Sequence, residues 1–143
     1  TLNALVAADE VLLPIQCEYY ALEGVTQLMR TIEAVRHAMN KELRLGSILM
    51  TMFDGRTRLS TQVDEEVRTH FARETMSTRI PRSVRVSEAP SYSRSVLTYE
   101  PTSAGAVAYR EAAAEFAKRH ACDEHSTNTS GVKHPDASDT KKG

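Results

Sequence analysis

ILMTMFDG, residues 48–55, is the stretch that decides the fold, because a nearly continuous apolar run here ends at an Asp-Gly turn signal. The run shows no alternation of apolar and polar residues, which is typical of a strand covered on both faces inside a parallel sheet. VLLPI, residues 11–15, has the same character. Between the two runs, apolar residues recur at helical spacing over residues 21–39. This order predicts two parallel strands joined by a right-handed crossover.

Strand-like and helix-like patterns alternate along the rest of the chain, with short links between them. The alternation favours an α/β fold of three layers, in which a mostly parallel sheet is flanked by helices. The other predicted elements are a helix end at residues 2–6, a helix that opens with a capping box at Thr61 and Asp64, a strand over residues 75–80, a strand over residues 95–99 and a helix over about residues 103–119.

Length and composition narrow the classes of function. A chain of 143 residues forms one domain at most. Its formal net charge of -1 excludes a uniformly basic nucleic-acid binder and an acidic disordered chain. No apolar run approaches the roughly 20 residues that cross a bilayer. The two cysteines, Cys17 and Cys122, cannot form a disulfide scaffold. We therefore expect a cytoplasmic protein without a membrane partner.

The composition changes sharply near Arg119. Residues 1–119 are predicted to form the folded part, and residues 120–143 are predicted to form a disordered polar tail. The tail consists mostly of Ser, Thr, Asp, Lys, His, Asn and Gly, which cannot bury enough apolar surface to offset the entropy of ordering. Cys122 and His125 have ligand-like spacing, but two candidates in such a tail do not make a metal site.

Three loops are expected at one edge of the predicted sheet, because the carboxyl ends of parallel strands lie together. They comprise residues 16–20, 54–59 and 81–94. Ligands of open α/β sheets bind at this edge. The sequence therefore places its candidate functional residues in these loops.

Five arginines occur in two of these loops. Guanidinium groups suit phosphate because they are planar and weakly hydrated. One interpretation is a patch that faces the phosphates of a nucleotide or of a nucleic-acid backbone. The other is that these arginines are simply solvated, or paired with Glu88 and Asp54. The five are Arg56, Arg58, Arg82, Arg85 and Arg94.

No catalytic motif is present in the 143 residues. The glycines are isolated, so no G-x-x-x-x-G-K-[ST] loop can cradle a triphosphate. G-x-S-x-G and paired Cys-x-x-Cys motifs are absent as well. His37 and His70 fall within predicted helices and are interpreted as structural or exposed. Cys17 is interpreted as a small buried residue, with a reactive thiol as the alternative. The sequence predicts no catalytic residue and no metal ligand.

Three longer segments occur in a characteristic order: TLNALVAADEVLLPIQCEYYALEG (residues 1–24), LMTMFDGRT (49–57) and IPRSVRVSEAPSYSR (80–94). Together they resemble the carboxyl-terminal half of ParA/Soj-type chromosome and plasmid partitioning ATPases, over residues 1–119. The resemblance implies a deviant-Walker P-loop fold that binds ATP with Mg²⁺. It also implies an ATP-dependent homodimer that binds DNA without sequence specificity at the nucleoid, and a ParB-type centromere-binding protein as partner.

The resemblance also assigns roles to particular residues. Ser83 stands where family members often carry Asn, so its reach toward a ligand is shorter. Glu18 and Tyr19 fall in a loop near the family's dimer face. The family's P-loop, its signature lysine and its acidic strand motifs precede the matched part, so whether the chain is an enzyme by itself stays open. The implied site residues are Arg56 and Arg85 for DNA, and Pro81 and Ser83 for the adenine side of the nucleotide.

Two other interpretations remain open. The chain could be a stand-alone module that binds DNA or a protein partner without ATPase activity. It could also be a related deviant-Walker ATPase that positions membrane or signalling machinery. Proteins of that last kind generally end in an amphipathic segment, whereas the end of this chain is polar, which counts against it.

Overall fold

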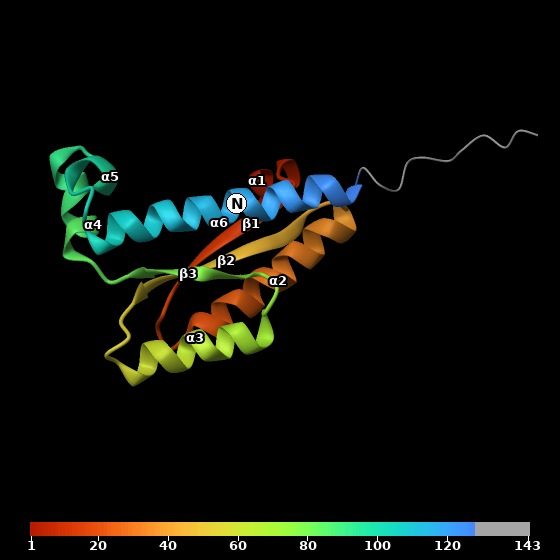
Figure 1. Ribbon diagram of the computed structural model, residues 1–143. Coiled ribbons are helices and arrows are strands. Elements are labelled where there is room, and N and C mark those ends of the chain that lie inside the picture. The colour runs from red at the N-terminus through yellow and green to blue at the C-terminus, as the bar shows by residue number, and fades with distance from the viewer. Residues whose placement is uncertain (128–143) are drawn as a thin grey trace, which may run out of the picture.

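The computed structural model describes residues 1–127 of the chain, and side chains as far as Ala121. Three parallel strands form one sheet in the order β1-β2-β3. Figure 1 shows the sheet between layers of helices. The elements are α1 (Leu2–Ala7), β1 (Glu10–Gln16), α2 (Ala21–Ala38), β2 (Arg44–Phe53), α3 (Arg58–His70), β3 (Thr75–Pro81), α4 (Val84–Glu88), the 3₁₀ helix η1 (Ala89–Tyr92), α5 (Val96–Tyr99) and α6 (Ala104–Thr127).

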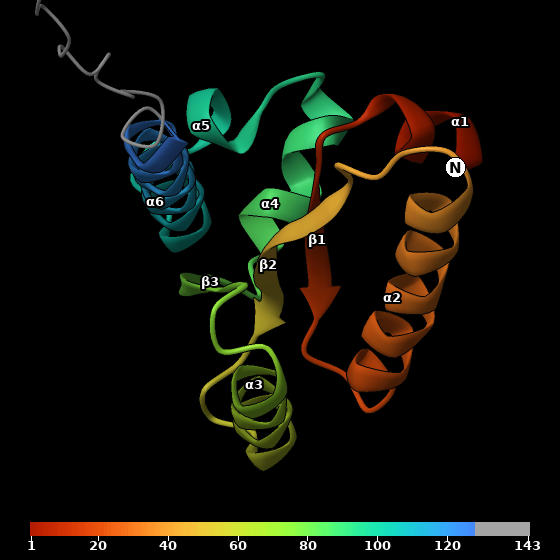
Figure 2. The ribbon, with the colours of Figure 1, turned by 90° about the vertical axis from the view of Figure 1, so that its right-hand side faces the viewer.

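Helices α2 and α3 cover one face of the sheet and α6 covers the other (Figure 2). This is the predicted three-layer α/β arrangement, which the structure confirms. Each face has its own apolar core, built from side chains that alternate along the strands. The first core contains Ile15, Cys17, Ala21, Val25, Ile48, Met50, Val63 and Val67, and the second contains Leu49, Met76, Ile80, Ala108 and Ala112.

The three apolar runs at residues 11–15, 48–53 and 75–80 are strands, as predicted. The expectation that residues 11–15 are covered on both faces is wrong, because Leu12 and Pro14 are exposed on one face of β1.

The prediction of a capping box at Thr61 and Asp64 is wrong, because α3 begins earlier, at Arg58. Thr57 caps this helix instead, and its hydroxyl accepts a hydrogen bond from the backbone N–H of Ser60 at 3.3 Å.

The strand predicted over residues 95–99 is also wrong. Val96 to Tyr99 form the short helix α5. Ser95 caps that helix, since its hydroxyl accepts a hydrogen bond from the backbone N–H of Leu97 at 3.1 Å. The local cap therefore outweighs the strand preference of the apolar side chains that follow it.

Helix α6 continues past Arg119 to Thr127, so it is longer than the apolar pattern predicted. The Arg119 and His120 side chains explain part of this extension, because Arg119 bonds to the Thr75 carbonyl of β3 and His120 bonds to Glu10 of β1. The rest of the predicted tail, and the side chains of Cys122 and His125, lie outside the described residues. Within residues 1–127, no helix is both long enough and apolar enough to cross a membrane.

Candidate functional site

The carboxyl ends of the strands lie at one end of the molecule, on the left in Figure 1. The loop between β2 and α3 and the segment that carries α4 both leave the sheet there. The backbone N–H of Arg82 donates a hydrogen bond to the carbonyl of Phe53 at 2.9 Å, which joins the two exits. Arg56 and Arg85, which follow different strands, therefore share one end of the sheet.

A cavity of about 270 Å³ opens at this carboxyl end, between the sheet and helices α4 and α6. Pro81 and Ser83, the two residues that the family resemblance assigns to the nucleotide, both line it. Its lining is apolar groups, hydroxyls and one amide, without a charged side chain. Such a lining suits a base or a sugar better than phosphates. The lining residues are Pro14, Gln16, Thr51, Met52, Ile80, Pro81, Ser83, Val86, Ser87 and Tyr109.

Met52 is the strained residue of this cavity. Its φ of 55° lies in the left-handed region, which is uncommon for any residue except glycine. The register between β2 and β3 shifts here, between Met50 and Phe53. Strain of this kind costs about 1–3 kcal/mol and is concentrated at functional sites. The sequence analysis missed Met52, because nothing in the identity of a methionine predicts a positive φ.

Arg56 is highly exposed, with 89% of its side chain accessible. Its guanidinium binds Asp54 through two hydrogen bonds of 3.0 Å, from Nε to Oδ1 and from Nη2 to Oδ2. The backbone N–H of Arg56 also donates to Oδ1 at 3.1 Å. The hydrogen bonds from the Arg56 side chain and backbone lower the pKa of Asp54 to about 2. Asp54 is therefore ionised at neutral pH.

Arg85 makes the corresponding pair on α4. Its Nη1 donates to the carboxylate of Glu88 at 3.1 Å, one turn further along the helix. The pairing of Arg56 and Arg85 with Asp54 and Glu88, which the sequence analysis left open as an alternative, is thus present. Both guanidinium groups nevertheless remain exposed to solvent. The three other arginines of the patch are exposed and make no ion pair within the described part of the chain; they are Arg58, Arg82 and Arg94.

Cys17 is buried at this end, with 4% of its surface exposed. Burial raises the pKa of its thiol to about 11, with a smaller contribution from the nearby Asp64. The favoured interpretation of Cys17 as a buried residue is therefore confirmed. The loop that follows it presents Tyr19 and Tyr20 to solvent, with their rings 5.2 Å apart in a T-shaped contact. Glu18, also exposed, and Tyr19 remain interface candidates.

Asp64 is a buried charge that the sequence analysis took for a cap. Its Oδ2 accepts hydrogen bonds from Arg68 at 3.0 Å and from Arg79 at 2.6 Å. Burial alone raises the pKa of Asp64, but the two arginines bring it below its usual range. Arg79 also lies over the Phe53 ring, 5.3 Å from its centre. The cluster ties α3, and with it the Arg56 loop, to β3.

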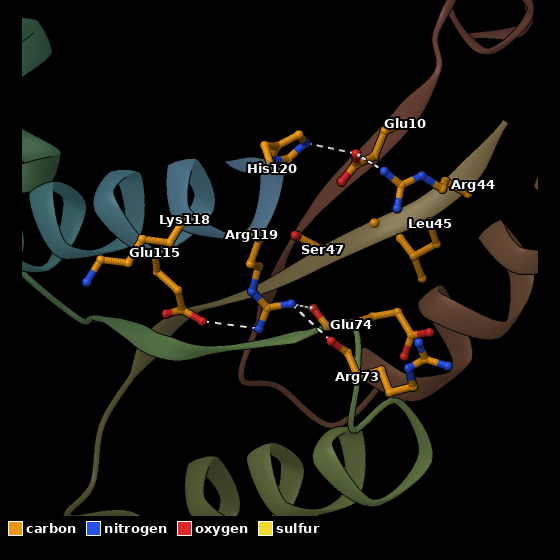
Figure 3. A pocket seen from close by; sticks show the side chains of 11 residues that line it. Glu10, Arg44, Leu45, Ser47, Arg73, Glu74, Glu115, Lys118, Arg119 and His120 are labelled. Carbon is orange, nitrogen blue, oxygen red and sulfur yellow. Dashed lines mark hydrogen bonds and ion pairs between the residues drawn. The ribbon is translucent and has the colours of Figure 1, made fainter. Parts of the chain in front are cut away.

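A larger cavity of about 710 Å³ lies at the opposite end, where the strands begin and α6 ends (Figure 3). Several charged groups there bond to each other or to the backbone of the sheet. Glu10 accepts hydrogen bonds from His120 at 2.9 Å and from Arg44 at 3.1 Å. Arg119 donates to Glu115 at 3.1 Å. Because these groups serve the fold, we do not assign a ligand to this cavity.

Glu115 and Arg119 also close the free edge of β3. The carboxylate of Glu115 accepts the backbone N–H groups of Ser77 and Thr78 at 2.6 and 2.8 Å. Arg119 donates to the carbonyls of three consecutive residues where the chain enters that strand. Capping of this kind protects an edge strand from unwanted pairing. The sequence analysis missed this role, because the partners are far apart in the chain. The three carbonyls belong to Arg73, Glu74 and Thr75.

Within residues 1–121, where side chains are described, no group of three or more His, Cys, Asp or Glu could hold a metal ion. The cavity at the carboxyl end supplies no cation for phosphates either. The described residues therefore fit the base end of a nucleotide, but not its triphosphate or a Mg²⁺ ion.

The layered parallel sheet, with its cavity at the carboxyl end, defines an α/β protein of the P-loop NTPase-like fold class. Solved structures support this class. Cobyrinic acid a,c-diamide synthase from Mycobacterium smegmatis matches with a TM-score of 0.57 and 35% identity, over 76% of this chain and 38% of that one. Its structure with bound ADP and magnesium gives a TM-score of 0.56 and 35% identity, over 76% and 37% of the two chains. A family model described as an AAA domain matches residues 1–45.

Curated relatives narrow the class to a family. The chromosome-partitioning ATPase Soj of Thermus thermophilus is 52% identical over 119 residues, which are 83% of this chain and 48% of that protein. The chromosome partitioning protein ParA of Caulobacter vibrioides is 50% identical, over 83% and 45%. The sporulation initiation inhibitor protein Soj of Bacillus subtilis is 48% identical, over 82% and 46%. The chain belongs to the ParA/Soj family of partitioning ATPases, and spans about half the length of these relatives.

Proposed function

We propose that this chain supplies the adenine-side loop and the non-specific DNA-binding arginines of a ParA/Soj-type ATPase that segregates chromosomes or plasmids. The supporting observation is that Arg56 and Arg85 follow different strands and yet expose their guanidinium groups at one end of the sheet. A duplex presents phosphates at regular spacing, so several exposed arginines on one surface bind it whatever its sequence.

The nucleotide part of the proposal rests on the cavity of about 270 Å³. Pro81 ends β3 and fixes the local backbone, which holds the following groups in place against a base. Ser83 occupies the N-cap of α4, but its side chain makes no capping hydrogen bond. Its hydroxyl is therefore available to a base edge or a sugar.

ATP hydrolysis requires groups that these residues do not supply. The 143 residues hold no P-loop motif, and the described part holds no metal cluster. We expect the purified chain to hydrolyse ATP no faster than the buffer blank. A turnover that disappears on addition of a chelator would contradict this expectation. The ATP-dependent homodimer and the ParB-type partner belong to the same proposal, as properties of the family.

Binding to two duplexes of unrelated sequence tests the DNA part. In Arg56→Glu and in Arg85→Glu, the dissociation constant should rise by a similar factor for both duplexes. The slope of affinity against salt should fall by about one in each variant, since one phosphate contact is lost. Arg36→Glu, in the last turn of α2, makes the same charge change elsewhere and serves as the control. If Arg56→Glu and Arg85→Glu both bind like Arg36→Glu, the assignment is wrong.

A second candidate function is a stand-alone DNA-binding module without nucleotide. The observation in its favour is that the cavity at the carboxyl end supplies no cation for the phosphates of a nucleotide. Titration with ATP separates the two functions. Weak binding that Ser83→Ala reduces supports the nucleotide-binding half, whereas DNA binding without any measurable ATP binding supports the module.

A further inference from the structure

We propose that Asp54 and Glu88 are built-in competitors of DNA phosphate, which occupy Arg56 and Arg85 and thereby limit the strength of DNA binding. The inference rests on the proposed function, because it concerns the same surface. It assigns a role to two carboxylates that the nucleotide and DNA sites do not otherwise use.

The Arg56 pair shows the competition most clearly. Asp54 engages Nε and Nη2 together, both at 3.0 Å. Arginine uses this same planar fork to bind a phosphate group. A phosphate that approaches this side of the guanidinium must therefore displace the carboxylate. Because the pKa of Asp54 is about 2, its carboxylate stays charged through neutral pH and can compete with a phosphate there.

The Arg85 pair repeats the arrangement on a different element. A single carboxylate, Glu88, holds Nη1 at 3.1 Å, and both side chains are substantially exposed at 55% and 40%. Glu100 lies near the same guanidinium and acts on it only through its charge. Each of the two main arginines of the proposed DNA surface is thus held by a nearby carboxylate, although one lies in a loop and the other on α4.

These pairs are weak enough to exchange. An exposed ion pair contributes little net stability, because water screens it. Arg119, at the other end of the molecule, instead binds three backbone carbonyls as well as Glu115, and is fixed. Replacing a local carboxylate by a DNA phosphate therefore costs little. The competition still lowers the affinity of one chain, so that strong binding requires two surfaces acting together.

Matched substitutions in the full chain test the proposal. Asp54→Asn keeps an oxygen for the backbone N–H of Arg56 while it removes the competing charge. Glu65→Gln, which lines the same loop surface, removes one charge without releasing an arginine. Glu88→Gln and Glu100→Gln form the corresponding pair around Arg85. Dissociation constants are measured by fluorescence anisotropy with two unrelated duplexes.

Asp54→Asn and Glu88→Gln should each bind both duplexes about two- to fivefold more tightly than the wild type. Glu65→Gln and Glu100→Gln should change the affinity by less. If wild type binds, and each competitor variant only equals its control, the inference is overturned and the proposed function stands. If no variant binds either duplex, both fail. Carboxylate NMR adds a readout without DNA, since an ordinary pKa near 3.8 for Asp54 would also overturn the inference.

Discussion

The two ends of the sheet use charge in opposite ways. At the amino end of the sheet, where the strands begin, His120 bonds to Glu10 across 110 positions of the chain, with an N–O distance of 2.9 Å. At the carboxyl end, Arg56 bonds to Asp54, which is two positions away, at the similar distance of 3.0 Å. The distances are alike, but only the first contact joins separate elements of the fold. The second contact joins Arg56 to a carboxylate of its own loop and leaves the guanidinium exposed.

Sequence separation between the partners thus helps to distinguish the two roles. A long-range pair disappears on unfolding and contributes to the stability of the native state. A pair within one turn or loop forms whenever that segment forms, and it can be exchanged for a ligand without loss of the fold. If this distinction is correct, substitutions in the charge pairs where the strands begin will change stability, and substitutions in the charge pairs where the strands end will change binding.

Removal of Glu115 should give the largest change in stability. Glu115→Ala leaves the backbone N–H groups of Ser77 and Thr78 without their acceptor on the free edge of β3. We expect a loss of about 2 kcal/mol in the free energy of unfolding. Urea denaturation followed by circular dichroism measures it. Glu111→Ala, at an exposed position of the same helix, is the matched control. Equal midpoints for the two variants would contradict the edge-capping role.

Two helical glycines differ in the space around them, so their substitution by alanine should have opposite effects on stability. A Cβ at Gly105 of α6 would lie 2.5 Å from Cγ2 of Val86, on the helix that carries Arg85. Gly105→Ala should therefore lower the free energy of unfolding by about 1 kcal/mol and weaken DNA binding by displacing α4.

A Cβ at Gly24 meets nothing within 4 Å. Gly24→Ala should stabilise α2 by up to about 1 kcal/mol. Thermal melts of both variants test this, and a stabilised Gly105→Ala with normal DNA binding would contradict the close packing.

Substitution of His120 should change the free energy of unfolding least, because 41% of its side chain is exposed. Hydrogen bonds to the Phe116 carbonyl and to Glu10 raise its pKa above 6.5. Because the pKa is higher in the folded chain, the protonated ring stabilises the fold. This contribution is fully present below pH 6.5, the ordinary pKa of histidine, and it is lost as the pH rises through the pKa of the folded state. The unfolding free energy should therefore fall slightly as the pH rises above 6.5. His120→Gln should remove that part of the pH dependence. An unchanged profile would contradict the contact.

Much of the fold could be predicted from the sequence, because local patterns control it. The apolar run of β2 lacks alternation and α2 has a clear apolar stripe, so both were recognisable. Ser95 and Thr57 show where this approach fails. In each case one hydroxyl fixes the start of a helix, and the surrounding apolar residues gave no sign of it.

The candidate site was predictable only in part. Parallel strand order brings Arg56 and Arg85 to one end, and this order follows from the sequence pattern. The carboxylates that hold them could be named only as alternatives, because pairing depends on side-chain geometry. The Glu115 contacts and the strained Met52 could not be predicted, since they arise from elements that meet only in the folded chain.

One measurement tests the central claim most directly. Arg56→Glu/Arg85→Glu reverses two charges at the carboxyl end, and Arg73→Glu/Lys118→Glu reverses two exposed charges at the amino end. With an unrelated duplex, the first variant should lose at least about tenfold in affinity and about two units of salt slope. The second should stay within about twofold of wild type, because its charges do not face DNA. Equal losses in the two variants would contradict the account.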